Sequence, residues 1–354
     1  MNDTLSLMKT LVSTSGLSGY EDPIREKIRS VWEPLTDEIH VSRMGSLHGL
    51  KRGAGAPPRN SILLAAHMDA IGLMVTGVID GYLRVAEIGG IDARVLSGHA
   101  VTVHGRRELK GVIVSPNRNL LPDNLDGKAV PLEYLLVDVG MAPEFVNENV
   151  RVGDLISFAQ PPVTIGKEFL AGHSLDNRAS VAALTGSLSL LKGRQCEWDV
   201  WAVATVQEEE TFAGAYTSTF ELRPSIAIAI DVTHAAGPGV PEHKTTSFGE
   251  GPVLGWGPNI HPALYRAILD LAEELEIPHE KEPLPRHSGT DAYAIQVTGA
   301  GIATMVVSIP LRYMHTPVEM VSIKDVERCS RLLAEFICSL DGGFMERLAW
   351  ETES

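Results

Sequence analysis

Cysteine is scarce in this chain, with only three in 354 residues: Cys196, Cys329 and Cys338. Their number is odd, and no two of them stand in the CxxC spacing typical of redox or metal-binding motifs. Small secreted proteins that rely on disulfides use cysteine far more densely. We therefore expect a reducing compartment and no disulfide framework.

Basic charge and long apolar runs are also in short supply. The chain has 30 Lys and Arg against 45 Asp and Glu, for a net charge of −15, which argues against nucleic-acid binding through a basic surface. No apolar stretch approaches the roughly 20 residues that span a bilayer. The amino terminus lacks a basic start followed by an apolar run, so no signal peptide is evident. We expect a cytoplasmic protein without nucleic-acid or membrane partners.

The most informative stretch is Asp199–Glu210, DVWAVATVQEEE. Its first eight residues are apolar apart from Asp199 and Thr205, as in a fully buried parallel strand. Glu208, Glu209 and Glu210 follow, and adjacent carboxylates repel one another unless a cation lies among them. Ligands of open α/β sheets bind at the ends of such strands.

Other stretches repeat this pattern of an apolar strand that ends in a metal-type ligand. The strand Ser61–Ala66 leads to His67, Ser225–Ile230 leads to Asp231, and Ile302–Pro310 is soon followed by His315. Asp176 precedes the helix expected over Ala179–Lys192. One such coincidence is common, but five indicate a site.

The order of predicted strands and helices along the chain predicts the fold class and the division of the chain into domains. Buried strands alternating with helices, among them His261–Glu276 and Ile323–Leu340, predict an α/β domain with a mixed, largely parallel sheet flanked by helices. Short strands at regular spacing replace this pattern between residues 71 and 163, beginning with a hairpin around Asp80-Gly81. We expect a small all-β barrel at 71–163 inserted into a discontinuous catalytic domain of residues 1–70 and 164–354. The insert would serve either oligomerisation or gating of the active site.

The five candidate ligands are His67, Asp176, Glu209, Asp231 and His315. Two imidazoles and three carboxylates suit zinc, cobalt or manganese, and five ligands exceed what one catalytic ion uses. They suit two ions bridged by one carboxylate and a water. In an extended backbone the side chains of Glu208 and Glu209 point to opposite sides, so that one can bind metal while the other acts as general base. Asp69, two residues beyond His67, is suited to accept the second imidazole N–H.

Five stretches in this order resemble the glutamyl aminopeptidase and tetrahedral aminopeptidase family of co-catalytic metallopeptidases, some members of which are labelled endoglucanases. They are AAHMDAIGLMV, SLDNRAS, TVQEEE, AIAIDVTHA and YMHTPVEMVSIKDV, and SGYE and GTDA also look like family stretches. The resemblance covers nearly the whole chain, including the β insert.

The resemblance implies an aminopeptidase that removes the first residue of peptide substrates through a metal-bridging water activated by Glu208. His67, Asp176 and Asp231 would hold one ion, and Asp176, Glu209 and His315 the other, with zinc or cobalt as the usual metals. Family members pair through the inserted domain, which implies a dimer as building block and a larger homo-oligomer such as a dodecamer.

The sequence departs from the family pattern at two places next to predicted ligands. Asn177 follows the bridging acid where a second Asp is common, and Glu210-Thr-Phe-Ala-Gly214 replaces a Val-Gly-Leu-Arg-Gly-like stretch. In related di-metal peptidases the peptide bond after the bridging acid is cis. We therefore expect a cis Asp176–Asn177 bond, with Asn177 structural and not a ligand.

Two alternative functions remain open at this point. A metal-independent glycoside hydrolase needs two carboxylates about 5–9.5 Å apart, but that mechanism does not use His67 and His315. A non-catalytic assembly protein that keeps the fold would have no need of Glu208. Loss of activity on chelation would distinguish the metallopeptidase from the glycoside hydrolase. Any enzymatic activity would distinguish it from the assembly protein.

Overall fold

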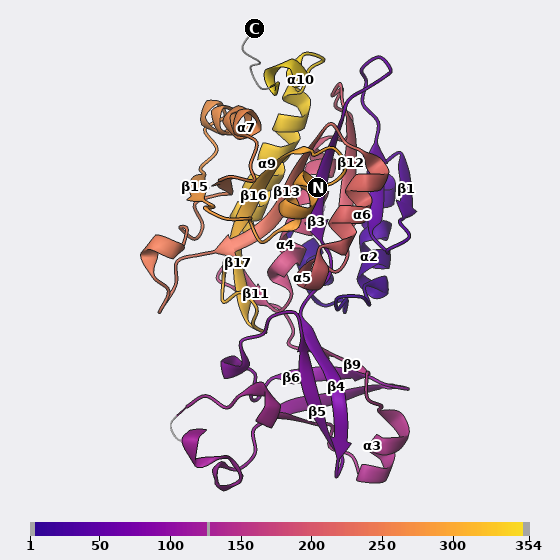
Figure 1. The fold of residues 1–354 in the computed structure, drawn as a ribbon, viewed down its shortest axis with the longest axis vertical. Helices are drawn as coiled ribbons and strands as arrows, with labels where there is room; N and C mark the ends of the chain where they lie inside the picture. The colour runs from indigo at the N-terminus through magenta and orange to yellow at the C-terminus, as the bar shows by residue number, and fades with distance from the viewer. Residues whose placement is uncertain (1–3, 126–127, 350–354) are drawn as a thin grey trace.

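A computed structural model describes residues 4–125 and 128–349 and shows two lobes arranged along the long axis (Figure 1). The larger lobe contains a mixed sheet covered by helices, and the smaller one contains a closed antiparallel barrel. This arrangement confirms the fold class expected from the sequence.

The large sheet has 11 strands in the described part of the chain, in the order β1-β2-β12-β3-β13-β16-β17-β11-β10, with β14 pairing with β15 and β16. Its central strands β12, β3, β13 and β16 are parallel. Both faces of these strands are covered, which is why their sequences are almost wholly apolar. The strands are β1 (Glu38–Val41), β2 (Leu47–Lys51), β3 (Ser61–His67), β10 (Val163–Ile165), β11 (Phe169–Gly172), β12 (Asp199–Thr205), β13 (Ile226–His234), β14 (Val253–Trp256), β15 (Glu280–Pro283), β16 (Ala303–Arg312) and β17 (Glu319–Ser322).

Helices cover this sheet on both faces. The buried α4 contacts β3, β13 and β16 and packs against α1 and α9, while α8 contacts the same strands and packs against α6. The helices of the large lobe are α1 (Thr4–Val12), α2 (Asp22–Trp32), α4 (Leu175–Leu190), α5 (Glu208–Thr211), α6 (Ala213–Leu222), α7 (Pro262–Glu274), α8 (Asp291–Gln296), α9 (Ile323–Ser339) and α10 (Phe344–Arg347). The expected helices at 179–192, 261–276 and 323–340 correspond to α4, α7 and α9.

The barrel closes in the order β4-β5-β8-β7-β6-β9 around its own apolar core. Its strands are β4 (Gly72–Ile79), β5 (Tyr82–Ile88), β6 (Ala100–His104), β7 (Glu108–Val114), β8 (Leu136–Asp138) and β9 (Leu155–Phe158), and the helix α3 (Pro143–Asn149) lies between β8 and β9 in the chain. Asp80 and Gly81 both have positive φ, as a tight hairpin turn requires, and join β4 to β5 as the sequence predicts.

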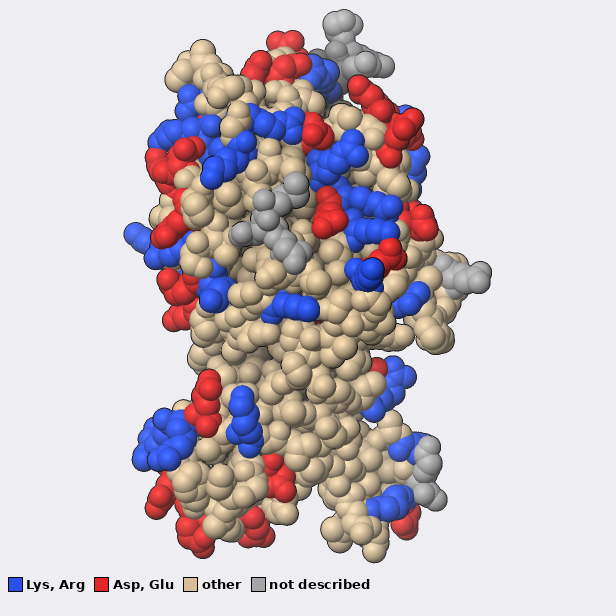
Figure 2. Space-filling view, turned by 180° about the vertical axis from the view of Figure 1, so that it is seen from behind, with Lys and Arg blue, Asp and Glu red and all other residues tan. Residues whose placement is uncertain are grey.

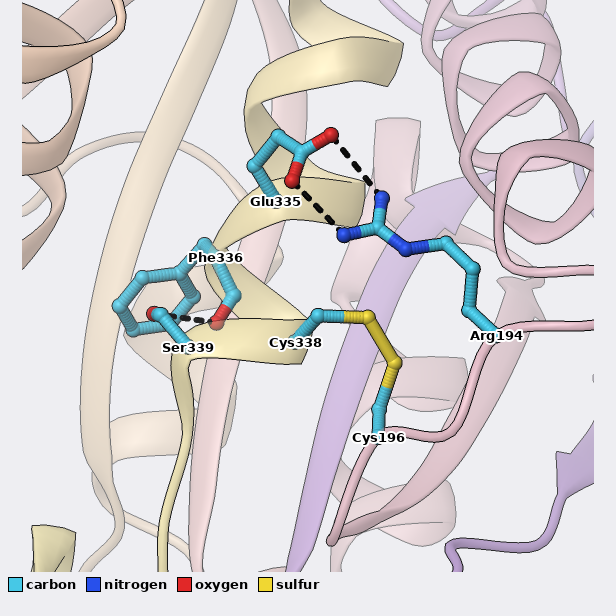
Figure 3. Close-up of a disulfide and its surroundings, with 6 residues drawn as sticks. All are labelled: Arg194, Cys196, Glu335, Phe336, Cys338 and Ser339. Carbon is cyan, nitrogen blue, oxygen red and sulfur yellow. Dashed lines mark hydrogen bonds and ion pairs between the residues drawn. A yellow bond between two sulfur atoms is a disulfide. The ribbon is translucent and has the colours of Figure 1, made fainter.

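One expectation from cysteine usage is wrong. Cys196, before β12, forms a disulfide with Cys338 near the end of α9, with 4.6 Å between their Cα atoms (Figure 3). The two cysteines are 142 residues apart, and packing of α9 on α4 brings them together. The spacing of the cysteines in the sequence does not predict this pairing. Because a disulfide is present, the number of cysteines no longer supports a reducing compartment.

The surface mixes both signs of charge. Figure 2 shows Lys and Arg interspersed with Asp and Glu over the large lobe, and a narrower waist above the barrel. The excess of acidic residues is therefore not gathered into one patch on this face. In the part of the chain that the structure describes, no helix combines the length and apolar character needed to cross a bilayer.

Candidate metal centre and active site

The ends of the central strands bring the predicted ligands together. His67 is the last residue of β3, Asp231 lies within β13, Glu208 and Glu209 follow β12, and His315 follows β16. Asp176 lies in the first turn of α4. Because β12, β3, β13 and β16 are parallel, their carboxyl ends meet at one edge. The five predicted ligands and Glu208 all line one cavity of about 380 Å³.

Asp176 stands between two groups of side chains. Its Oδ1 lies 3.1 Å from Nε2 of His67, and the same nitrogen is 3.7 Å from Oδ1 of Asp231. Its Oδ2 lies 3.5 Å from Nε2 of His315, which is 3.4 Å from Oε2 of Glu209. Two oxygens of one carboxylate facing two groups of donors is the arrangement that a bridging ligand needs.

Donor atoms of His67 also cluster with other partners. In one group, the donor atoms of His67, Asp176 and Glu209 all lie within 4.8 Å of one another. In a second group, the same holds for the donor atoms of His67, Glu208 and Asp231. The Oε2 atom of Glu208 is 3.8 Å from Nε2 of His67. Glu208 therefore faces the same space as the ligand set.

The peptide bond between Asp176 and Asn177 is cis, as predicted. The Nδ2 atom of Asn177 donates a hydrogen bond to the carbonyl oxygen of Ile230 at 3.0 Å. Asn177 thus ties the first turn of α4 to the strand that carries Asp231.

The backbone of Glu208 and Glu209 is helical, and the extended backbone expected from the sequence is wrong. Gln207 and Phe212, on either side of α5, both have left-handed backbone conformations, which set this short turn apart from β12 and α6. Successive side chains on a helix diverge by about 100° instead of the 180° of a strand. Glu208 and Glu209 still separate, but into neighbouring directions within one cavity.

Asp69 connects these elements. Its carboxylate accepts hydrogen bonds from the backbone N–H groups of Glu208 at 3.0 Å and Glu209 at 3.2 Å, and from the Ser18 hydroxyl at 2.5 Å. Nδ1 of His67 is 3.2 Å from the carbonyl oxygen of Asp69 and 3.5 Å from its Oδ1. Asp69 therefore holds the turn that presents Glu208 and Glu209 as well as the ring of His67.

Sequence reasoning missed several supporting carboxylates. Glu319, buried on β17, accepts hydrogen bonds from the backbone N–H groups of Asp176 and His315, each at 3.0 Å. Glu21 accepts from the N–H of Gln207 at 3.2 Å, and Asp291 accepts from the Thr205 hydroxyl at 2.5 Å. All three lie in the stretches that resemble the family, which is the one signal that could have found them.

Buried carboxylates that repel one another line the cavity, and bound cations would offset this repulsion. Burial, then the charges of Asp231, Asp291 and Glu209, raise the pKa of Glu208 well above its usual range, against the opposing effect of His67. Burial and the Asp176 carboxylate do the same for the pKa of Glu209. Among the described residues, Oε1 of Glu209 is a buried oxygen with no hydrogen-bond donor. The nitrogen and oxygen donors present therefore fit divalent metal ions.

The barrel reaches the edge of this site. The backbone N–H of Asp92 donates to the carbonyl oxygen of His315 at 3.2 Å, and the N–H of Gly89 donates to Oε1 of Glu210 at 2.7 Å. The segment after β5 is therefore fixed to two of the loops that carry predicted site residues.

Residues 45–332 match the family described as M42 glutamyl aminopeptidase. The chain belongs to this family. It is 34% identical to the lysyl aminopeptidase of Pyrococcus furiosus over 92% of this chain and 94% of that one. The structure of a TET aminopeptidase from a marine-sediment Thaumarchaeota archaeon superimposes with a TM-score of 0.92 at 30% identity, covering 98% and 99% of the two chains.

A third relative bears on assembly. The TET1 peptidase of Pyrococcus horikoshii, described as assembling into a tetrahedron or a large octahedral shell, matches with a TM-score of 0.83 at 29% identity over 96% of this chain and all of that one. The resemblance inferred from sequence motifs is thus confirmed, and the chain is an aminopeptidase of the hydrolase class. The glycoside hydrolase and assembly-protein alternatives are not favoured.

Proposed function

We propose that the chain removes single residues from the free amino terminus of peptides at a centre that binds two divalent ions, zinc or cobalt. The proposal rests on the position of the Asp176 carboxylate, whose Oδ1 atom faces His67 and whose Oδ2 atom faces His315. His67, Asp176 and Asp231 would hold one ion, and Asp176, Glu209 and His315 the other. Two such ions would supply polarisation of the scissile carbonyl and a lowered pKa of the attacking water. Glu208 takes the proton from that water and delivers it to the leaving amine.

Chelation tests this proposal. Dialysis against a chelator should abolish cleavage of aminoacyl chromogenic substrates, and zinc or cobalt should restore it. Peptides with an acetylated amino terminus should remain intact, because the acidic cavity suits an ammonium group. Mass spectrometry that finds internal cuts in a blocked peptide would rule out the exopeptidase. Activity that survives removal of metal would favour a two-carboxylate hydrolase instead.

Glu282 is a candidate for contact with the first residue of the substrate. Among the described residues that line the ligand cavity, it is the only carboxylate outside the predicted ligands and Glu208. Its Oε1 atom accepts a hydrogen bond from the hydroxyl of Thr233 at 2.8 Å. Thr233 lies on β13, two residues beyond Asp231. Two residues along a strand span about 6.6 Å, close to the reach of a lysine side chain. We propose a preference for basic first residues, in line with the name of the Pyrococcus furiosus relative.

The Glu282→Gln variant should lower kcat/KM for a lysyl substrate about 10-fold or more while leaving a leucyl substrate nearly unchanged, since it removes one charge-assisted contact. Glu280→Gln is the matched control, because Glu280 lies on the same strand but does not line the ligand cavity. An equal loss for both substrates would instead assign Glu282 to binding of the α-ammonium group.

We further propose that residues 1–70 and 164–354 form the catalytic domain, and that residues 71–163 serve oligomerisation, with a dimer as building block of a larger shell such as a dodecamer, and not gating of the site. The support is the assembly described for the Pyrococcus horikoshii relative and the absence of predicted ligands from 71–163. Light scattering should give a mass above that of a dimer. A monomer at working concentration would contradict the proposal.

The cytoplasmic location remains a prediction. The Cys196–Cys338 bond is the observation that weighs against it, because disulfides are rare in the cytosol of most organisms. Fractionation of the source cells, with alkylation of free thiols during lysis, would decide both points together.

A further inference from the structure

A second cluster of metal-type side chains lies outside the predicted site. His40 on β1 and His48 on β2 are directly opposite each other in the antiparallel pair, so their side chains leave the same face of the sheet. Glu221 projects toward them from α6. These three residues belong to none of the family stretches in which the predicted ligands lie.

The distances within the cluster match those between ligands of one ion. Nε2 of His40 is 3.2 Å from Nδ1 of His48 and 3.6 Å from Oε1 of Glu221, and the three donor atoms all lie within 4.8 Å of one another. Two nitrogens bound to a tetrahedral zinc at its usual bond length are ~3.3 Å apart. The pair of imidazoles is therefore already spaced as zinc would space it.

The second nitrogen of His48 has a partner of its own. Nε2 of His48 lies 2.8 Å from the Ser218 hydroxyl, and the ring has no exposed surface. If Nε2 carries the proton and donates it to Ser218, the lone pair of Nδ1 faces His40 and Glu221. Metal-binding histidines are commonly oriented by such a second hydrogen bond. Ser218 and Glu221 are three residues apart on α6, so one face of this helix supplies both the orienting group and the carboxylate.

Two of the three side chains of the cluster are exposed to solvent. The side chains of His40 and Glu221 are 43% and 48% exposed, whereas His48 is buried beneath them. The ring of His40 stands edge-on to both His48 and Trp201, with centroid distances of 4.9 and 6.1 Å. These contacts limit the movement of His40 and leave an open side where a water molecule can complete a coordination shell.

We propose that His40, His48 and Glu221 form a third metal site, which binds one divalent ion of the zinc class. Two imidazoles and one carboxylate favour zinc, cobalt or nickel over magnesium and calcium, which prefer oxygen ligands. The ion would join the β1–β2 pair to α6, the helix that directly follows α5. The site is structural and takes no part in peptide hydrolysis, so the inference does not depend on the proposed function.

Metal counting in a background without the catalytic pair tests the site. In Asp176→Ala, equilibrium dialysis against zinc alone followed by elemental analysis should find one ion per chain. Adding His40→Ala should remove it, whereas His99→Ala, a histidine in the barrel, should leave it in place. His40→Gln gives a second variant of similar volume in case His40→Ala disturbs folding, which circular dichroism will reveal.

Otherwise unaltered chains give the complementary result. His40→Ala should bind one ion fewer than the unaltered chain and keep its peptidase activity, and Glu221→Gln should weaken zinc binding about 10-fold or more, the scale on which metal sites respond to single substitutions. Cobalt bound in the Asp176→Ala background should show the absorption of a tetrahedral ion. Equal metal content in Asp176→Ala with and without His40 would overturn the site and leave a hydrogen-bonded histidine pair.

Discussion

Glu208→Gln should bind metal normally and lose at least ~100-fold in turnover, the usual contribution of a general base. Gln keeps the size of the side chain but cannot accept the proton of the attacking water. Burial and neighbouring carboxylates raise the pKa of Glu208 above its usual range, and its Oε2 atom lies 3.8 Å from Nε2 of His67, inside the cavity that the predicted ligands line. Its backbone N–H is bound to Asp69, so the substitution leaves the turn in place.

The comparison with two other variants makes this result specific. Glu210→Gln makes the same change two residues along α5, on an exposed side chain, and should retain nearly full turnover. Asp176→Ala should lose metal as well as activity, because Asp176 faces both groups of ligands. Near-normal turnover of Glu208→Gln with full metal content would remove Glu208 from the role of base.

The fold class could be predicted from the sequence because local pattern and tertiary structure agree, and the same strand ends bring the five predicted ligands to one cavity. The parallel strands β3, β12 and β13 are buried on both faces, and a long apolar run that stops at a polar residue marks both the strand and the edge of the sheet where ligands gather. The hairpin at Asp80-Gly81 was readable because tight turns have few acceptable residues.

Features that depend on distant contacts were not readable. The helical turn at Glu208 is held by Asp69, which is more than a hundred residues away, and the sequence around Glu208 gave no sign of it. Glu319 lies four residues after His315, but only the fold shows that its carboxylate reaches Asp176. His40 and His48 lie 8 residues apart in the sequence, and only the pairing of β1 with β2 places them opposite each other.

The Cys196–Cys338 bond should be a major source of stability in the large lobe. A cross-link that closes a loop of 142 residues limits the unfolded chain, and loop-closure entropy of this size corresponds to about 4–5 kcal/mol in the free energy of unfolding. The bond joins the segment before β12 to the end of α9, beside the Arg194–Glu335 ion pair, whose two N···O distances are 2.9 and 2.8 Å (Figure 3). The ion pair is partly exposed and contributes little by comparison.

The double variant Cys196→Ala/Cys338→Ala should therefore unfold at a clearly lower denaturant concentration than the oxidised protein. Tryptophan fluorescence can follow this transition, since Trp198 is buried two residues from Cys196 and donates a hydrogen bond to the carbonyl oxygen of Asp341. Reduction of the unaltered protein should cause a similar loss, and the reductant should have no effect on the double variant. The buried thiol of Cys329 remains in every sample, so it cannot account for a difference between them. An unfolding midpoint that neither reduction nor the double substitution lowers would show that the cross-link contributes no stability.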